Sequence, residues 1–152
     1  EGLYLLSYML MADHEKAERC FVGGLEDSVN GNSVYKQWAR SWARRRIIQC
    51  AIRTILPGLQ HADDQLNVEA ESEGNPALAA ILHLAAFERF VFVMSVLEGY
   101  SDQECSILLG CSRGDVVAVR TQALRHLSKL DADHVPPFAD AALHPVTKTQ
   151  TL

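Results

Sequence analysis

The sequence predicts an all-α protein in which two small helical lobes are joined by an acidic linker. Three observations lead to this prediction. Apolar residues recur at the three- to four-residue spacing of a helix face, and no segment shows the alternation that is typical of a strand. Residues that begin or end helices flank these segments. Between the two groups of helices, residues 57–76 contain five acids and no lysine or arginine, which is typical of a flexible linker.

The predicted N-terminal lobe, residues 1–56, begins with two short helices. The apolar run Leu3–Met11 predicts the first helix. Asp13 is in position to cap the second, because its carboxylate can accept hydrogen bonds from the exposed N–H groups of a helix start. Glycine disfavours helix interiors, so the pair Gly23-Gly24 predicts that this second helix does not continue far.

A strong third helix is predicted from Val34 to Leu56, where Pro57-Gly58 follows. Its large apolar residues recur at helical spacing and predict one stripe: Tyr35, Trp38, Trp42, Ile48 and Ile52. Its arginines form the densest basic cluster of the chain and are candidates for binding a nucleic-acid backbone: Arg40, Arg44, Arg45 and Arg46. The two tryptophans could stack on exposed bases, but we favour the interpretation that they belong to the core and that the arginines alone are solvated.

A new helix is predicted to begin after the linker, with Asn75 as its N-cap and Pro76 at its first position. One long apolar helix is predicted from there to about Leu97, where Gly99 stops it. Its length is near that of a bilayer span. Three ionisable residues fall inside it: His83, Glu88 and Arg89. Charges of this kind favour a buried helix of a protein without membrane contact.

The segment Leu97–Leu127 predicts two further helices that are joined by a tight turn at Gly110. Ser101 to Glu104 is a capping box for the first, and Ser112 caps the second, which we expect to reach about Leu130. Six apolar residues are expected to pack between them: Cys105, Leu108 and Leu109 under Val116, Val119 and Leu124. This pattern predicts a helix-turn-helix in the C-terminal lobe, residues 77–130. A helical hairpin that merely packs is the alternative, and the proline-containing residues 131–152 are predicted to form a flexible tail.

Charge and cysteine usage limit the chemistry. The net charge is −5, which is unfavourable for binding phosphates, but the acidity lies mainly in the linker and the tail, and residues 1–56 carry eight basic against six acidic residues. Four cysteines show neither zinc spacing nor a disulfide framework, so we expect reduced, buried thiols in a cytoplasmic protein: Cys20, Cys50, Cys105 and Cys111. Phosphate-loop, metalloprotease and nucleophile-elbow motifs are missing, so we expect no enzyme, no metal and no cofactor.

Several motifs carry a resemblance to a known family. They are Glu88-Arg89-Phe90-Val91-Phe92, Leu97-Glu98-Gly99-Tyr100-Ser101, Glu104, Leu109-Gly110-Cys111-Ser112, Val116, and Ala123-Leu124 with Leu127. Across residues 84–130 the chain resembles the C-terminal promoter-binding domain of extracytoplasmic-function bacterial sigma factors. More weakly, Tyr4–Leu25 is similar to the start of the core-binding sigma domain, and Trp38–Arg53 to its basic helix. The resemblance implies a subunit that binds RNA polymerase core and promoter DNA, with an anti-sigma factor or another regulatory protein as a further partner.

The last helix departs from that family, because Asp115-Val116-Val117-Ala118-Val119 stands where threonine, lysine, serine and arginine are usual. An acid repels phosphate, and valines cannot replace ionic contacts. The remaining candidates for contacting phosphates or base edges are Arg113, Arg120, Gln122 and Arg125, whose alternative is an ordinary solvated face. A second hypothesis stays open. In it the chain keeps the sigma fold and acts only through protein–protein contacts, dimerising or binding a regulator through the apolar face Val116-Val117-Val119.

Overall fold

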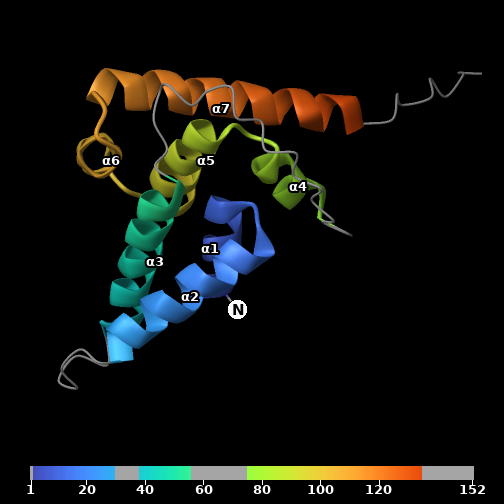
Figure 1. Ribbon diagram of the computed structural model, residues 1–152. Helices are drawn as coiled ribbons and strands as arrows, with labels where there is room; N and C mark the ends of the chain where they lie inside the picture. The colour runs from blue at the N-terminus through green and yellow to red at the C-terminus, as the bar shows by residue number, and fades with distance from the viewer. Residues whose placement is uncertain (1, 30–37, 56–74, 135–152) are drawn as a thin grey trace, which may run out of the picture.

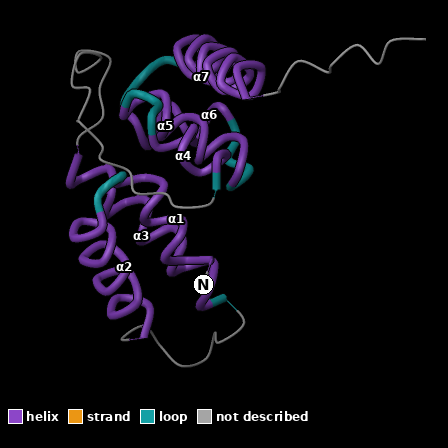
Figure 2. The backbone as a smooth tube through the Cα atoms, turned by 90° about the vertical axis from the view of Figure 1, so that its right-hand side faces the viewer, coloured by secondary structure: helices purple, strands orange, loops and turns teal. Residues whose placement is uncertain are grey.

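The computed structural model describes residues 2–29, 38–55 and 75–134. Within these ranges the chain forms helices and no strand, which confirms the predicted all-α class. None of the helices described is long and apolar enough to cross a membrane. Residues 57–74 of the predicted linker, residues 135–152 of the predicted tail and Tyr35 lie outside the described residues. Residues 131–134, which belong to the predicted tail, are helical. Figures 1 and 2 show α1, α2 and α3 in one half of the molecule and α7 lying across α5 and α4 in the other.

The first half of the chain consists of α1 (Gly2–Met11), α2 (His14–Val29) and α3 (Ala39–Ile55), which pack against one another pairwise. Asp13 caps α2 as predicted, because its Oδ1 accepts the N–H of Lys16 at 2.9 Å. The prediction that α2 ends soon after its two glycines is wrong. Gly24 is buried against α3, where a β-carbon would lie 2.7 Å from Cγ1 of Ile47, so close helix packing explains this glycine.

The second half does not contain the single long helix that the sequence predicts. The chain breaks at residues 83–85, between α4 (Pro76–Leu82) and α5 (Ala86–Phe92), and α5 continues into the π-helical turn η3 (Val93–Leu97). Asn75 does cap α4, accepting the N–H groups of the second and third residues after it. The last two helices are α6 (Asp102–Leu109) and α7 (Arg113–His134).

Arg89 explains how the break is tolerated. Its side chain is 2% exposed, and Nη1 donates hydrogen bonds to the carbonyl groups of Leu82 at 3.2 Å and Leu84 at 2.9 Å. The carbonyl of Leu82 ends α4, where a helix leaves acceptors without helical partners, and the carbonyl of Leu84 lies in the break itself. Nε donates to the carbonyl of Leu10 at 3.3 Å and thereby joins the break to α1. Burial lowers the pKa of Arg89 to about 10.

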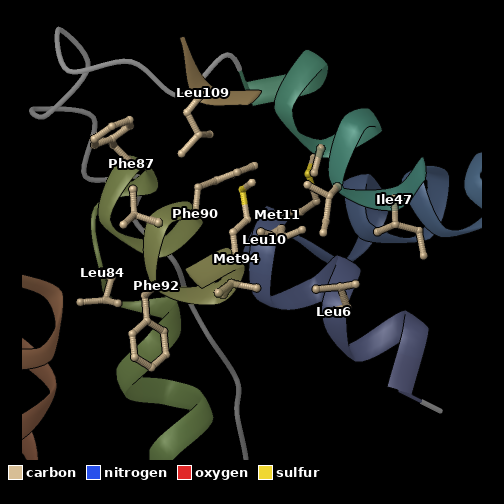
Figure 3. Packing of buried hydrophobic residues seen from close by; sticks show 14 of the residues in the cluster. Leu6, Leu10, Met11, Ile47, Leu84, Phe87, Phe90, Phe92, Met94 and Leu109 are labelled. Carbon is tan, nitrogen blue, oxygen red and sulfur yellow. The ribbon is translucent and has the colours of Figure 1, made fainter. Parts of the chain in front are cut away.

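Most of the buried apolar residues of both halves belong to one hydrophobic cluster. Figure 3 shows Leu10 and Met11 of α1 beside Phe90 and Met94 of the second half. Ile47 and Ile48 extend the cluster into α3. On the other side it reaches the last two helices through these residues: Cys105, Leu109, Val116 and Ala123. The position of α7 is therefore fixed through the same core as that of α1 and α3.

Candidate nucleic-acid interface

The start of α6 and the turn at its end are both formed by local features that the sequence predicts. The N–H and hydroxyl of Ser101 donate to Oε2 of Glu104 at 2.9 and 2.8 Å, and the Ser101 hydroxyl accepts the N–H of Glu104 at 3.3 Å. Gly110 ends α6 with φ +67°, a left-handed conformation that favours glycine. The predicted capping box and glycine turn are both confirmed.

Asp115 has a structural role at the start of α7. Its Oδ2 accepts the N–H of Ser112 at 3.0 Å, and the Ser112 hydroxyl accepts the N–H of Asp115 at 3.1 Å. Hydrogen bonding of the Asp115 carboxylate with the side chain of Ser112, and after it with the backbone N–H of Ser112, lowers the pKa of Asp115. An anion in the first turn also interacts favourably with the helix dipole. The acid that departs from the sigma pattern is thus one half of a second reciprocal cap.

One face of α7 packs on the core. Val116 and Ala123 are fully buried, and Val119 and Leu127 are partly buried against the same cluster. From α6, Cys105 and Leu109 are buried and Leu108 is partly buried, as expected. The expectation that Leu124 packs there is wrong, since it is 46% exposed and Ala123 occupies the inward position. A shift of one residue turns a helix by 100°, which carries Leu124 off the buried face.

The four candidate residues of α7 do not form one group. Arg113, Gln122 and Arg125 are exposed. Arg120 instead donates to the carboxylate of Asp102 in the first turn of α6, and the two side chains are 29% and 33% exposed. Sequence reasoning missed Lys129, which is exposed and follows Arg125 by one helical turn. The face outside the core therefore presents Gln122, Arg125 and Lys129 together.

The arginine cluster of α3 is also divided. Arg40 and Arg45 are exposed. Arg44 forms an ion pair with Glu98 at 3.3 Å, just after η3, and the guanidinium of Arg46 lies over the ring of Trp42 with 6.0 Å between the guanidinium carbon and the ring centroid. The pKa of Glu104 on α6 is lowered first by its hydrogen bonds with Ser101. The positive charge of Arg45 adds a smaller effect in the same direction. Two of the four arginines thus serve contacts within the protein.

The two tryptophans are not core residues, contrary to the prediction. Trp38 is 60% exposed and Trp42 is 57% exposed. The residues of α3 that face the core are smaller: Ala43, Ile47, Ile48 and Ala51. With neighbouring arginines, both tryptophans line an open groove of about 530 Å³, whose other lining residues are Ser41, Arg45, Arg46 and Gln49. Exposed indole rings beside guanidinium groups provide stacking surfaces for planar ligands such as bases.

No protein-family model, curated protein or solved structure matches this chain.

The contacts that the sequence did not reveal join residues far apart in the chain. His126 on α7 and the buried Glu88 on α5 lie 3.0 Å apart, between Nδ1 and Oε2. The sulfur atoms of Cys20 and Cys50 lie 2.8 Å apart across α2 and α3. All four cysteines are free thiols, but Cys50 and Cys111 are only partly buried, so the expectation of four buried thiols is wrong for these two.

Proposed function

We propose that this chain is a sigma-like regulator of transcription initiation, with α6, the turn at Gly110 and α7 acting as a helix-turn-helix. Its observed support is the asymmetry of α7. Val116 and Ala123 hold one side of the helix in the core, whereas Gln122, Arg125 and Lys129 share the side that faces away. A helix held along one side can enter the major groove with the other.

The chemistry of the exposed face suits duplex DNA. Arginine and lysine neutralise phosphates or bind guanine, and glutamine can pair with adenine. Between residues 113 and 129, α7 carries four basic residues and one acid, and that acid is the helix cap Asp115. The local charge is therefore positive although the chain as a whole is acidic. We assign phosphate contacts to Arg113, Arg125 and Lys129 and base contact to Gln122.

The first half of the chain would act beside the second as the other lobe, fused to it through their shared core. The exposed groove of Trp38 and Trp42 on α3 gives this lobe a surface for bases and phosphates, and Arg45 lines the same groove. Arg40 is exposed on another side of α3, near Gly2. We assign the binding of RNA polymerase core to this lobe, because the resemblance to sigma factors implies it. The proposed protein acts in the cytoplasm, needs no cofactor, and can be controlled by a regulatory protein such as an anti-sigma factor.

Fluorescence anisotropy with a pool of random duplex DNA tests the proposal. We expect binding at about 50 mM salt and a steep loss of affinity toward about 200 mM, because each phosphate contact releases counterions. Replacing both Arg125 and Lys129 with alanine should reduce the salt slope by about two, roughly one per contact. Arg19→Ala on α2 is the matched control, since it removes an exposed arginine far from α7. Absence of binding at the lower salt concentration, with and without polymerase core, would overturn the proposal.

One observation favours a second candidate function. Of the three valines in the predicted face, Val116 is fully buried and Val119 is partly buried, so only Val117 is exposed. Val117 and Leu124 are 43% and 46% exposed and lie seven residues apart, hence on one side of α7. In this alternative the chain is a degenerate sigma-fold protein that dimerises or binds a regulator through this side without reading DNA. Sedimentation of the wild-type chain and of the Val117→Asp variant separates the two candidates. A dimer that the substitution dissociates, together with no DNA binding, would support the alternative.

A further inference from the structure

Two cysteines from different helices meet where α2 packs on α3. Cys20 lies on α2 and Cys50 on α3, 30 positions apart in sequence, and their sulfur atoms are 2.8 Å apart. A disulfide bond measures about 2.05 Å, so the sulfur atoms need to approach by less than about 1 Å to form one. The hydroxyl of Thr54 lies 3.8 Å from the sulfur of Cys20 and completes a small polar cluster.

The two thiols differ in their access to solvent. Cys20 is 2% exposed, whereas Cys50 is partly exposed. Cys50 also lines an open cavity of about 300 Å³ together with residues of both helices: Gly23, Gly24, Glu26, Arg46, Gln49, Arg53 and Thr54. A small oxidant in this cavity therefore reaches the sulfur of Cys50 and is kept away from that of Cys20.

We propose that Cys20 and Cys50 form a redox-active dithiol that a hydroperoxide converts into an intramolecular disulfide. In the first step the sulfur of Cys50 attacks the peroxide, the O–O bond breaks, and Cys50 becomes a sulfenic acid as water or an alcohol leaves. In the second step the sulfur of Cys20 attacks the sulfur of Cys50, and water leaves with the proton of the Cys20 thiol. The peroxide gains the two electrons that the two thiols lose.

The environment of Cys20 fits the role of the second, resolving thiol. Burial, and after it the hydrogen bond with Cys50, raises the pKa of Cys20 to about 12. Cys20 is consequently protonated at neutral pH and is a poor first nucleophile, because the thiolate is the reactive form. Its short distance from Cys50 compensates in the second step, which takes place within one molecule. The proposal is independent of DNA binding, although Arg46 and Gln49 line both this cavity and the tryptophan groove.

Peptide mapping of the whole wild-type chain tests the proposal. The chain is treated with hydrogen peroxide, its remaining thiols are alkylated, and it is digested with trypsin without reduction. Cys20 then lies in the peptide 20–36 and Cys50 in the peptide 47–53, whereas Cys105 and Cys111 share the peptide 90–113. We expect peptides 20–36 and 47–53 to be recovered as one disulfide-linked species that dithiothreitol separates. Recovery of both as alkylated single peptides, or of either linked to peptide 90–113, would overturn the proposal.

Three variants test the order of the steps. In Cys20→Ser we expect the oxidation of Cys50 to stop at the sulfenic acid, which dimedone traps. In Cys50→Ser we expect Cys20 to remain a thiol, and Cys111→Ser, which removes another partly exposed thiol, should form the linked species as the wild type does. The disulfide closes a long loop, so the oxidised wild-type chain should melt roughly 10 °C higher than the reduced chain. Dimedone labelling of Cys20 in Cys50→Ser would contradict the assigned order.

Discussion

Arg120 on α7 donates to the carboxylate of Asp102, which stands in the first turn of α6. The pair joins the two helices on the far side of the turn at Gly110 and is about two-thirds buried. A carboxylate in a first turn is also favoured by the helix dipole, so Asp102 stabilises α6 and fixes α7 at the same time. Arg120 therefore serves the geometry of the helix pair.

A double-mutant cycle measures how much the pair of Asp102 and Arg120 contributes to the free energy of unfolding. Asp102→Asn and Arg120→Gln should each lower the free energy of unfolding by about 1 kcal/mol, since water screens the exposed third of the pair. The double variant should lose less than the sum, with a coupling of about 0.5–1 kcal/mol in urea unfolding. Arg125→Ala, on the exposed face of the same helix, should leave stability nearly unchanged. A coupling near zero would show that the pair does not hold α6 to α7.

The two capping boxes should make stability depend on acid pH. Hydrogen bonds with Ser101 lower the pKa of Glu104 from its ordinary 4.5, and those with Ser112 lower that of Asp115 from 3.8. A lowered pKa in the folded state contributes stability above the ordinary value, and this contribution is lost as pH falls through the lowered value. We expect the wild-type chain to lose more stability between about pH 5 and pH 3 than a variant that combines Glu104→Gln with Asp115→Asn.

Urea midpoints at the two pH values provide the measurement for these caps. Glu18→Gln serves as the control because Glu18 is exposed and takes no part in either cap. It should show the same loss of stability on acidification as the wild type. An equal loss in the capping variant would mean that the two carboxylates contribute nothing to the pH dependence.

The parts of the fold that the sequence predicts well depend on neighbours three or four positions apart. Ser101 with Glu104, and Asn75 with Pro76, identify helix starts without knowledge of any other helix. The break at residues 83–85 could not be found in this way. Apolar spacing continues through it, and its carbonyl groups are satisfied by Arg89, whose position depends on the packing of α1 and α5.

The candidate site was harder to predict because exposure is decided by tertiary contacts. The predicted stripe of Trp38, Trp42 and Ile48 has helical spacing, yet only Ile48 is buried. The core is centred on the neighbouring side of α3, where Ala43 and Ile47 allow close approach of α2. Ion pairs such as Arg44–Glu98 join residues that no local pattern connects. A residue such as Arg120 therefore looked available for DNA in the sequence and is paired in the structure.

The exposure of the tryptophans leads to a prediction about stability. Trp38→Ala and Trp42→Ala should each lower the free energy of unfolding by less than about 1 kcal/mol, because more than half of each side chain is already in water. Ile47→Ala on the buried side of α3 should cost about 3 kcal/mol or more. Chemical unfolding of the three variants provides the comparison. If the tryptophan substitutions lowered the free energy of unfolding as much as Ile47→Ala, both rings would have to be buried in the core.

The two neighbouring glycines of α2 should respond to alanine in opposite directions. A β-carbon at Gly23 meets no atom within 4 Å, so Gly23→Ala should raise the free energy of unfolding by about 0.5–1 kcal/mol through helix propensity. At Gly24 the β-carbon would lie 2.7 Å from Cγ1 and 3.3 Å from the backbone N of Ile47. The resulting separation of α2 from α3 should cost about 1–3 kcal/mol and exceed the propensity gain.

Both alanine variants can be compared by urea unfolding of the reduced chain, which keeps the cysteine pair from contributing. Because the two positions are adjacent in one helix, differences in intrinsic propensity cancel, and the difference between the variants reports the contact with Ile47 alone. We expect Gly24→Ala to be less stable than Gly23→Ala by about 2 kcal/mol or more. Equal stability of the two variants would mean that α2 does not approach α3 as closely as the structure shows, and the short distance between Cys20 and Cys50 would then be in doubt as well.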